Sequence, residues 1–234
     1  METRLSAIDR VVFEVAERAT GGPRALSLRG LLLVVIVAGG LYGAVMGSFF
    51  MVSAERAVLV LIGATKVPML VLVTTAICIP AFFVLNTIAG LREDWAAALR
   101  CVLASQAAFA VALLSLAPAI RVTYWSGATH VWAILWNSTA FLVAAILAHA
   151  VLRRAYRPLV RTRPAHRVML VAWMILYSFV GVQTGWMLRP FVGKPDLPVA
   201  YFRDGAFTNA YVELTATVLD GLRSSTRRDQ PMPY

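Results

Sequence analysis

Charged residues are scarce in this sequence, and its longest apolar runs contain none. Of 234 residues, only 15% are Asp, Glu, Lys or Arg, whereas 59% are hydrophobic, and the mean hydropathy is +0.72. A water-soluble domain of this size needs more charge to cover its surface. The composition therefore excludes a soluble globular fold and indicates an integral membrane protein.

Cysteines and catalytic signatures are also rare. Cys78 and Cys101 lie in or at the edge of apolar runs without a CxxC or Cys/His pattern, so we expect neither a disulfide framework nor a metal site. HExxH, GxSxG and Walker motifs are absent. His130, His149 and His166 lie at the ends of runs or in a basic loop, which does not favour a haem ligand pair. We therefore expect no cofactor, and the absences favour a protein that is not an enzyme.

Five uncharged runs are long enough to cross the hydrocarbon core of a bilayer, which takes about 20 helical residues. Only helices and closed barrels satisfy their backbone groups in lipid, and these runs lack the alternation of barrel strands. The sequence therefore predicts an all-α polytopic membrane protein with five transmembrane helices. The predicted spans are Gly30–Val52, Val67–Gly90, Cys101–Ile120, Val131–Leu152 and Val168–Leu188.

Three segments outside these runs have their own patterns. Residues 3–19 place apolar side chains at helical spacing, which is typical of an amphipathic helix on the membrane interface. Residues 57–65 are apolar but short, and Lys66 and Pro68 separate them from the second run, so we expect a shallow interfacial or re-entrant segment. Residues 210–222 predict a short helix along the outer face. The chain is thus divided into an interfacial segment, a membrane domain and an outer segment, at residues 1–29, 30–189 and 190–234.

Basic residues on alternate sides of the five runs predict the orientation of the chain. Thirteen of the 22 Lys and Arg residues fall on the side of the amino-terminal segment, and nine fall on the other side. Cytoplasmic connections carry the excess of Lys and Arg in membrane proteins. We therefore expect a protein of the cell (inner) membrane whose amino terminus is cytoplasmic and whose carboxy terminus is outside.

Small residues repeat every four positions in the first run, at Gly39, Gly43 and Gly47. This spacing lets two helix backbones approach closely in a membrane. The glycine seam predicts packing against another span of the same chain or, alternatively, an interface with a second copy or a partner protein. Weaker seams that we expect to face it are Gly181 with Gly185, and Ala140 with Ala144 and Ala148.

Uncharged polar residues occur at membrane depth, where each costs free energy unless it is partnered. Pro80 leaves the carbonyl of Ala76 without its helical donor, so we expect a kink in the second span. The sequence predicts either interhelical hydrogen bonds or an amide-lined cavity for a neutral polar group. The residues proposed for this cavity are Pro80, Asn86, Gln106, Asn137 and Gln183; Thr74, Ser105 and Ser138 are further polar residues in the spans.

Basic residues are concentrated between the fourth and fifth runs, which contributes to the formal net charge of +10. The position of this cluster beside the membrane favours a role in topology, with binding of anionic lipid head groups as the alternative. The clustering between apolar runs does not favour a nucleic-acid groove. The six residues are Arg153, Arg154, Arg157, Arg161, Arg163 and Arg167.

Two stretches carry a resemblance to known proteins. KVPMLVLVTTAICIPAFFVLNTIAG, from Lys66 to Gly90, and GVQTGWMLRPFVG, from Gly181 to Gly193, resemble a group of bacterial multi-pass membrane proteins with no assigned activity. The layout of a cytoplasmic amino-terminal segment and five spans is also similar to that of Yip1-type proteins. The resemblance implies a five-span fold and carries over no catalytic or ligand residue.

The first functional hypothesis is a non-catalytic membrane component, either a scaffold or a subunit of a larger assembly. It would associate with itself or another membrane protein through the glycine seam and the outer segment. The alternative is a permease or channel-like subunit for a neutral or lipidic solute. A membrane enzyme is the third hypothesis, with a site formed by the outer residues Asp196, Arg203, Asp204 and Glu213.

Overall fold

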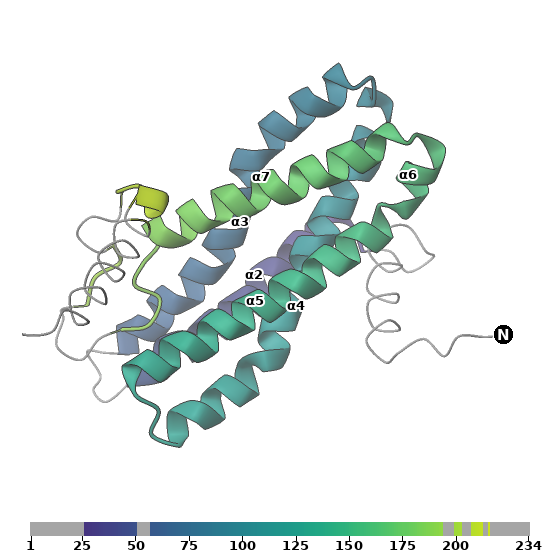
Figure 1. Ribbon diagram of the computed structural model, residues 1–234. Helices are drawn as coiled ribbons and strands as arrows, with labels where there is room; N and C mark the ends of the chain where they lie inside the picture. Colours follow the sequence, from purple (N-terminus) through teal and green to yellow (C-terminus); the bar gives the residue numbers. More distant parts are fainter. Residues whose placement is uncertain (1–25, 51–56, 194–198, 203–206, 213–214, 216–234) are drawn as a thin grey trace, which may run out of the picture.

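The computed structural model describes residues 26–50, 57–193, 199–202, 207–212 and 215. Within these residues the regular elements are all helical, and five helices are long and apolar enough to cross a membrane (Figure 1). They are α2 (Leu28–Gly47), α3 (Val58–Ile88), α4 (Trp95–Trp125), α5 (His130–Ala155) and α7 (Ala165–Met187). The short elements are η1 (Ser48–Phe50), η3 (Arg92–Asp94) and α6 (Arg157–Thr162). The predicted all-α, five-span fold is therefore confirmed.

Local signals begin α2 and separate the helices at two tight turns. The hydroxyl of Ser27 accepts a hydrogen bond of 3.1 Å from the backbone N–H of Gly30, which caps the first turn of α2. Gly90 (φ 70°) separates α3 from η3 and α4, and Gly127 (φ 78°) separates α4 from α5. Positive φ values are costly for residues other than glycine. The predicted amphipathic helix over residues 3–19 lies outside the described residues.

The five long helices form an open ring in the order α5, α4, α2, α3, α7. Helix α2 packs extensively on both α3 and α4, while α5 packs on α4 and α7 packs on α3. Helices α5 and α7 lie at the two ends of this order and have no extensive contact with each other. Figure 1 looks onto α5 and α7, with α2 behind them. The ring is therefore open between α5 and α7.

The glycine seam of α2 is buried against α3. A Cβ atom at Gly43 would overlap the carbonyl oxygen of Gly63, and one at Gly47 would overlap the carbonyl oxygen of Leu59. Gly39 faces Pro68 at ordinary contact distance. Close backbone approach of this kind allows dispersion contacts that larger side chains prevent. The seam is thus used within the chain, as the first of the two sequence interpretations predicts.

The weaker seams do not face the glycine seam, so this expectation was wrong. Cβ atoms at Gly181 and Gly185 would contact Thr74 and Leu70 of α3, at 3.7 Å and 3.8 Å. The alanines of α5 face α4, because Ala140 and Ala144 lie in one buried cluster with Leu113, Ala117 and Ile120, and Ala148 is also buried. The cause is the ring order, in which α2 separates α3 from α4 and contacts neither α5 nor α7 extensively.

The expectation of a separate segment over residues 57–65, either shallow interfacial or re-entrant, was also wrong. Helix α3 begins at Val58 and continues through Lys66 and Pro68, so this stretch is its first part. The glycine seam explains the continuity, because Leu59 and Gly63 pack directly on α2. Tertiary contact therefore compensates for the helical hydrogen bond that Pro68 cannot donate.

Candidate functional site

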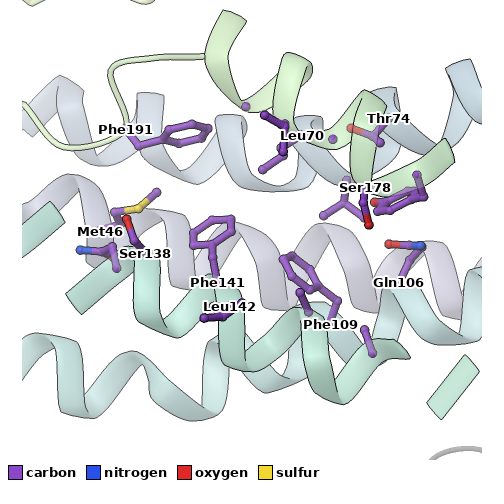
Figure 2. A pocket seen from close by; sticks show the side chains of 18 of the residues that line it. Met46, Leu70, Thr74, Gln106, Phe109, Ser138, Phe141, Leu142, Ser178 and Phe191 are labelled. Atoms are coloured by element: carbon purple, nitrogen blue, oxygen red, sulfur yellow. The ribbon is translucent and has the colours of Figure 1, made fainter. Parts of the chain in front are cut away.

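A cleft of about 830 Å³ lies between α5 and α7, at the opening of the ring. Its walls are α5 and α7, and residues of α2, α3 and α4 form its floor, including Met46, Leu70 and Phe109. Figure 2 shows Phe109 and Phe141 pointing into this space from one side, and Leu70 and Phe191 from the other. The lining is predominantly apolar, so the cleft offers a surface for apolar molecules.

The cleft follows almost the whole length of α5. Its lining residues on this helix recur at a spacing of three or four residues, which places them on one face. His130 and Leu152 are the first and last, and a rise of 1.5 Å per residue puts them about 33 Å apart. This length matches the roughly 30 Å thickness of the hydrocarbon core. The other members of this face are Val131, Ile134, Asn137, Ser138, Phe141, Leu142, Ala145, Ala148 and His149.

At the end of the molecule that contains α6, here called the α6 end, aromatic packing closes the cleft. Trp173 is 2% exposed and packs edge-on against Phe82 at 4.9 Å between ring centroids. Tyr156 belongs to the same buried cluster, and its hydroxyl has no hydrogen-bond partner among the described residues. Burial raises the pKa of Tyr156 above its ordinary value of 10.0, and the proximity of Cys101 and Asp94 raises it further.

At the opposite end, here called the Pro190 end, the chain leaving α7 lies along the cleft. Arg189, Pro190, Phe191 and Val192 all contribute to the lining. The ammonium group of Lys66 donates a 2.7 Å hydrogen bond to the carbonyl of Pro190. It also lies 4.9 Å from the ring centroid of Tyr201, a distance at which cation–π attraction contributes. Lys66 therefore fixes this segment, here called the strap (residues 189–192).

Lys66 does not lie in a connection between spans, as the sequence analysis assumed. It is the ninth residue of α3 and is fully buried. At 1.5 Å per residue, it lies about 12 Å inside the helix. A lysine so placed is expensive unless it is partnered, and the Pro190 carbonyl and the aromatic rings supply partners. It therefore belongs to the interior of the fold and not to the topogenic charges.

Asn137 is the centre of a satisfied hydrogen-bond network at the Pro190 end. Its side-chain oxygen accepts from the hydroxyl of Tyr42 at 2.9 Å. Its amide nitrogen donates to the hydroxyl of Tyr124 at 2.6 Å and to the carbonyl of Ala133 at 2.7 Å. The network joins α2, α4 and α5. The predicted interhelical role is therefore observed for this residue, although it also lines the cleft.

Gln106 lines the same cleft, but unlike Asn137 its amide is not hydrogen-bonded within the described residues. The residue is 5% exposed. Ser178 of α7 and Thr74 of α3 also line the cleft, and the buried hydroxyl of Thr74 has no hydrogen-bond partner in the described part of the chain. Figure 2 shows Gln106 and Ser178 pointing into the space between the helices. The cleft therefore contains polar groups with unused hydrogen-bonding capacity.

Only two of the five residues proposed for an amide-lined cavity lie at the cleft. Pro80 is exposed on the outside of α3, and Asn86 is buried with its amide donating to the carbonyl of Phe82 at 2.8 Å. Gln183 faces the outer segment, where it donates to the Thr208 carbonyl at 3.0 Å and accepts from the Ala210 N–H at 2.9 Å. The prediction of one cavity centred on Pro80 was therefore wrong. The helix faces decide this, because Pro80, Asn86 and Gln183 point away from the opening of the ring.

Gln183 instead holds the beginning of the outer segment. The hydroxyl of Tyr211 donates to the carbonyl of Phe179 at 2.8 Å, and the two rings stack at 4.6 Å. A helix begins at Ala210, as predicted, but most of the expected stretch up to Leu222 lies outside the described residues. The outer segment is thus docked on α7 from its first helical residues.

The six arginines of the basic cluster are not equivalent. Arg153, Arg157, Arg161 and Arg167 are exposed at the α6 end. Arg163 instead donates to a carboxylate oxygen of Glu93 at 3.2 Å and to the carbonyl of Gly90 at 3.1 Å. It therefore serves as a bridge between α6 and the turn after α3, which removes it from the proposed set of lipid contacts. His166, fully buried beside Asp94 at 3.1 Å, supports the same connection.

Sequence reasoning missed Ser178 and the cleft itself. The spacing of Ser178, Gly181 and Gly185 at i, i+3 and i+7 was an available signal, because it places all three on one face of a helix. Within the described residues, His, Cys, Asp and Glu side chains form no group of three that could hold a metal ion. The basic side chains that line the cleft are His130, His149 and Arg189, and its other polar lining residues are neutral.

Comparisons with protein-family models, curated proteins and solved structures gave no significant match. The resemblance to Yip1-type proteins therefore stays a prediction.

Proposed function

We propose that this chain is a non-catalytic membrane protein that binds a lipidic or neutral apolar solute in the cleft between α5 and α7. This is the permease-like or channel-like alternative of the sequence analysis. The observation that carries it is a cleft of about 830 Å³ that follows α5 from His130 to Leu152. An apolar molecule bound in such a cleft stays in an apolar environment along most of its length.

The volume of the cleft, about 830 Å³, is that of a small-molecule site. Small-molecule sites occupy about 300–1,000 Å³. A long, narrow and mainly apolar ligand therefore fits best.

We further propose that the α6 end is cytoplasmic and that the membrane is a bacterial cell membrane. The support is the gathering of exposed basic residues at this end, since cytoplasmic connections carry such an excess. Arg153, Arg157, Arg161 and Arg167 would then face anionic lipid head groups, with an attraction of about 1 kcal/mol each. Their proximity to the cleft would concentrate lipids at its cytoplasmic end.

Filling the cleft tests the proposed function. Ala145 lines the cleft, whereas its neighbour Ile146 is 60% exposed and does not. We expect native mass spectrometry after mild detergent extraction to detect a lipid-sized adduct on the wild type and on Ile146→Trp. Ala145→Trp should retain about tenfold less. Equal adducts on both variants, or none on the wild type, would contradict the proposal.

A partner protein remains a second proposal, now through the outer segment alone, because the glycine seam is occupied by α3. The supporting observation is the exposure of large apolar side chains there, with Phe207 at 75% and Val212 at 62%. Chemical cross-linking in native membranes, comparing the wild type with Phe207→Ser, tests this subunit hypothesis. An unchanged cross-linking pattern would argue against it.

A further inference from the structure

Three polar side chains from three helices meet the cleft near the middle of its length. Counted at 1.5 Å per residue from the α6 end, Gln106 lies about 16 Å along α4, Ser178 about 20 Å along α7 and Thr74 about 21 Å along α3. In a hydrocarbon core about 30 Å thick, these positions are close to the middle of the membrane. Here they are called the mid-cleft polar group.

The hydrogen-bonding capacity of this group is unused. Thr74 is 1% exposed, and its buried hydroxyl has no hydrogen-bond partner among the described residues. Gln106 is 5% exposed, and its amide makes no hydrogen bond within the described part of the chain and is accessible from the cleft. Most other buried polar side chains in the spans bond to a carbonyl of their own helix, as Ser105 does to Val102 at 2.7 Å. A buried polar group without a partner, such as the hydroxyl of Thr74, costs about 1–3 kcal/mol. A ligand that supplies the missing partner would recover this cost.

The chemistry of the group limits the ligand. An amide and two hydroxyls offer both donors and acceptors and carry no charge, so they complement a hydroxyl, carbonyl or amide group. A charged group at this depth would find no counter-ion in the mid-cleft polar group and would be costly in the membrane centre. The cleft on both sides is lined by apolar side chains, including Phe109, Phe141 and Leu142.

We infer that the cleft selects a neutral lipid with a single uncharged polar group near the middle of its apolar chain. Gln106 is the principal hydrogen-bonding residue, and Ser178 and Thr74 are the supporting ones. The inference rests on the proposed function, since it names the ligand class of the same cleft. A simple saturated chain would leave the mid-cleft polar group unpartnered and would bind more weakly.

A matched pair of probes tests the inference. Methyl hydroxystearate with its hydroxyl at mid-chain and methyl stearate are both neutral and differ in one oxygen. Their affinities are compared by competition against radiolabelled methyl stearate in micelles of fixed composition. We expect the wild type to bind the hydroxylated ester about fivefold more tightly, which corresponds to about 1 kcal/mol.

Variants assign this preference to the mid-cleft polar group. Gln106→Leu and Gln106→Met should lose the fivefold preference for the hydroxylated ester. Ser178→Ala should reduce it. Ser115→Ala is the control, because Ser115 lies on α4 outside the cleft and bonds to the carbonyl of Val111, and it should keep the preference.

The outcomes separate the two proposals. If the wild type binds both esters equally well, or Gln106→Leu retains the preference, selection by the mid-cleft polar group is wrong while the cleft remains a lipid site. If the wild type binds neither ester and retains no lipid on extraction, the proposed function fails, and the inference fails with it.

Discussion

Two pairs of helices in the same ring differ in how closely they approach. Helices α2 and α3 are in close contact, whereas α5 and α7 are separated by the cleft. In the first, glycines remove side chains so that two backbones touch, with Gly43 against Gly63. In the second, the walls stay apart and carry bulky side chains such as Phe141 and Phe191. Gly181 and Gly185 line this cleft and leave ordinary space around them. Glycine in a membrane helix thus marks either close packing or room for a ligand, and its neighbours decide which.

The same contrast holds for buried amides. Asn137 has three hydrogen bonds to three different residues, whereas Gln106 has none within the described residues. Both line the cleft and both are almost fully buried. One amide therefore stabilises the helix ring, and the other remains available to a ligand.

The largest effect is expected from adding one methyl group to the close contact. Gly43→Ala places a Cβ atom on the carbonyl of Gly63, so the free energy of unfolding should fall by about 3 kcal/mol, at the upper end of overpacking costs. SDS titration in mixed micelles measures this change. Gly185→Ala is the matched control in the cleft, with its nearest neighbour at 3.8 Å, and should change stability by less than about 1 kcal/mol. Equal losses in both variants would break the comparison.

The two amides should respond differently to the same substitution. Asn137→Leu leaves the buried hydroxyl of Tyr42 without its partner, and we expect a loss of about 1.5 kcal/mol, near the maximum measured for interhelical hydrogen bonds. Gln106→Leu removes no hydrogen bond described for the fold and should change the free energy of unfolding by less than about 0.5 kcal/mol. The same SDS titration compares them. A larger loss for Gln106→Leu than for Asn137→Leu would show that the assignments are reversed.

The strap should loosen when its lysine anchor is removed. Lys66→Met abolishes the 2.7 Å hydrogen bond to Pro190, so a cysteine at Val192 should react with a maleimide about fivefold faster, the equivalent of one net hydrogen bond. Cys78 and Cys101 are buried and give little background. The free energy of unfolding should change by less than the loss of this hydrogen bond alone would cause, because the variant also removes a buried charge. An unchanged rate would mean that packing alone holds the strap.

The smallest effect is expected where aromatic packing closes the cleft. Burial raises the pKa of Tyr156, so the folded state keeps the phenolic proton to higher pH than the unfolded chain. The corresponding stability is present below the unfolded pKa of about 10 and is lost as the pH rises above it. Tyr156→Phe should therefore reduce the alkaline loss in SDS titrations between pH 9 and about 11, and should raise stability at neutral pH by about 0.5 kcal/mol by removing an unpartnered hydroxyl. A steeper alkaline loss would contradict this assignment.

The positions of the long helices were predictable, but the contacts that each helix makes with its neighbours were not. Uncharged runs of about 20 residues are sufficient to locate a membrane helix, and all five were found. The start of α3 at Val58 instead of Val67 was missed because Lys66 and Pro68 were read as a boundary. In the structure, Lys66 finds partners on the strap and Pro68 packs against Gly39. Contacts with distant residues thus overrode a local signal.

The candidate site was predicted in its chemistry and only in part in its residues. Neutral polar groups at membrane depth were the right kind of signal, and Gln106 and Asn137 lie in the cleft. Pro80, Asn86 and Gln183 carry the same signal but do not line the cleft. Pro80 is exposed on α3, Asn86 bonds to its own helix and Gln183 bonds to the outer segment. A single polar residue in a uniformly apolar run gives no periodic pattern that shows which way its side chain faces. The packing of the whole helix against its neighbours decides this.

The sequence alone determined that this protein is made of membrane-spanning helices, because lipid requires long uncharged runs and helical hydrogen bonding. It also determined that two helices can touch along Gly39, Gly43 and Gly47, since only small residues permit that distance. Tertiary structure decided which helix fills that seam, which amide is satisfied and where the ring stays open. These depend on contacts between residues far apart in the chain, and such contacts exist only after the five helices have packed.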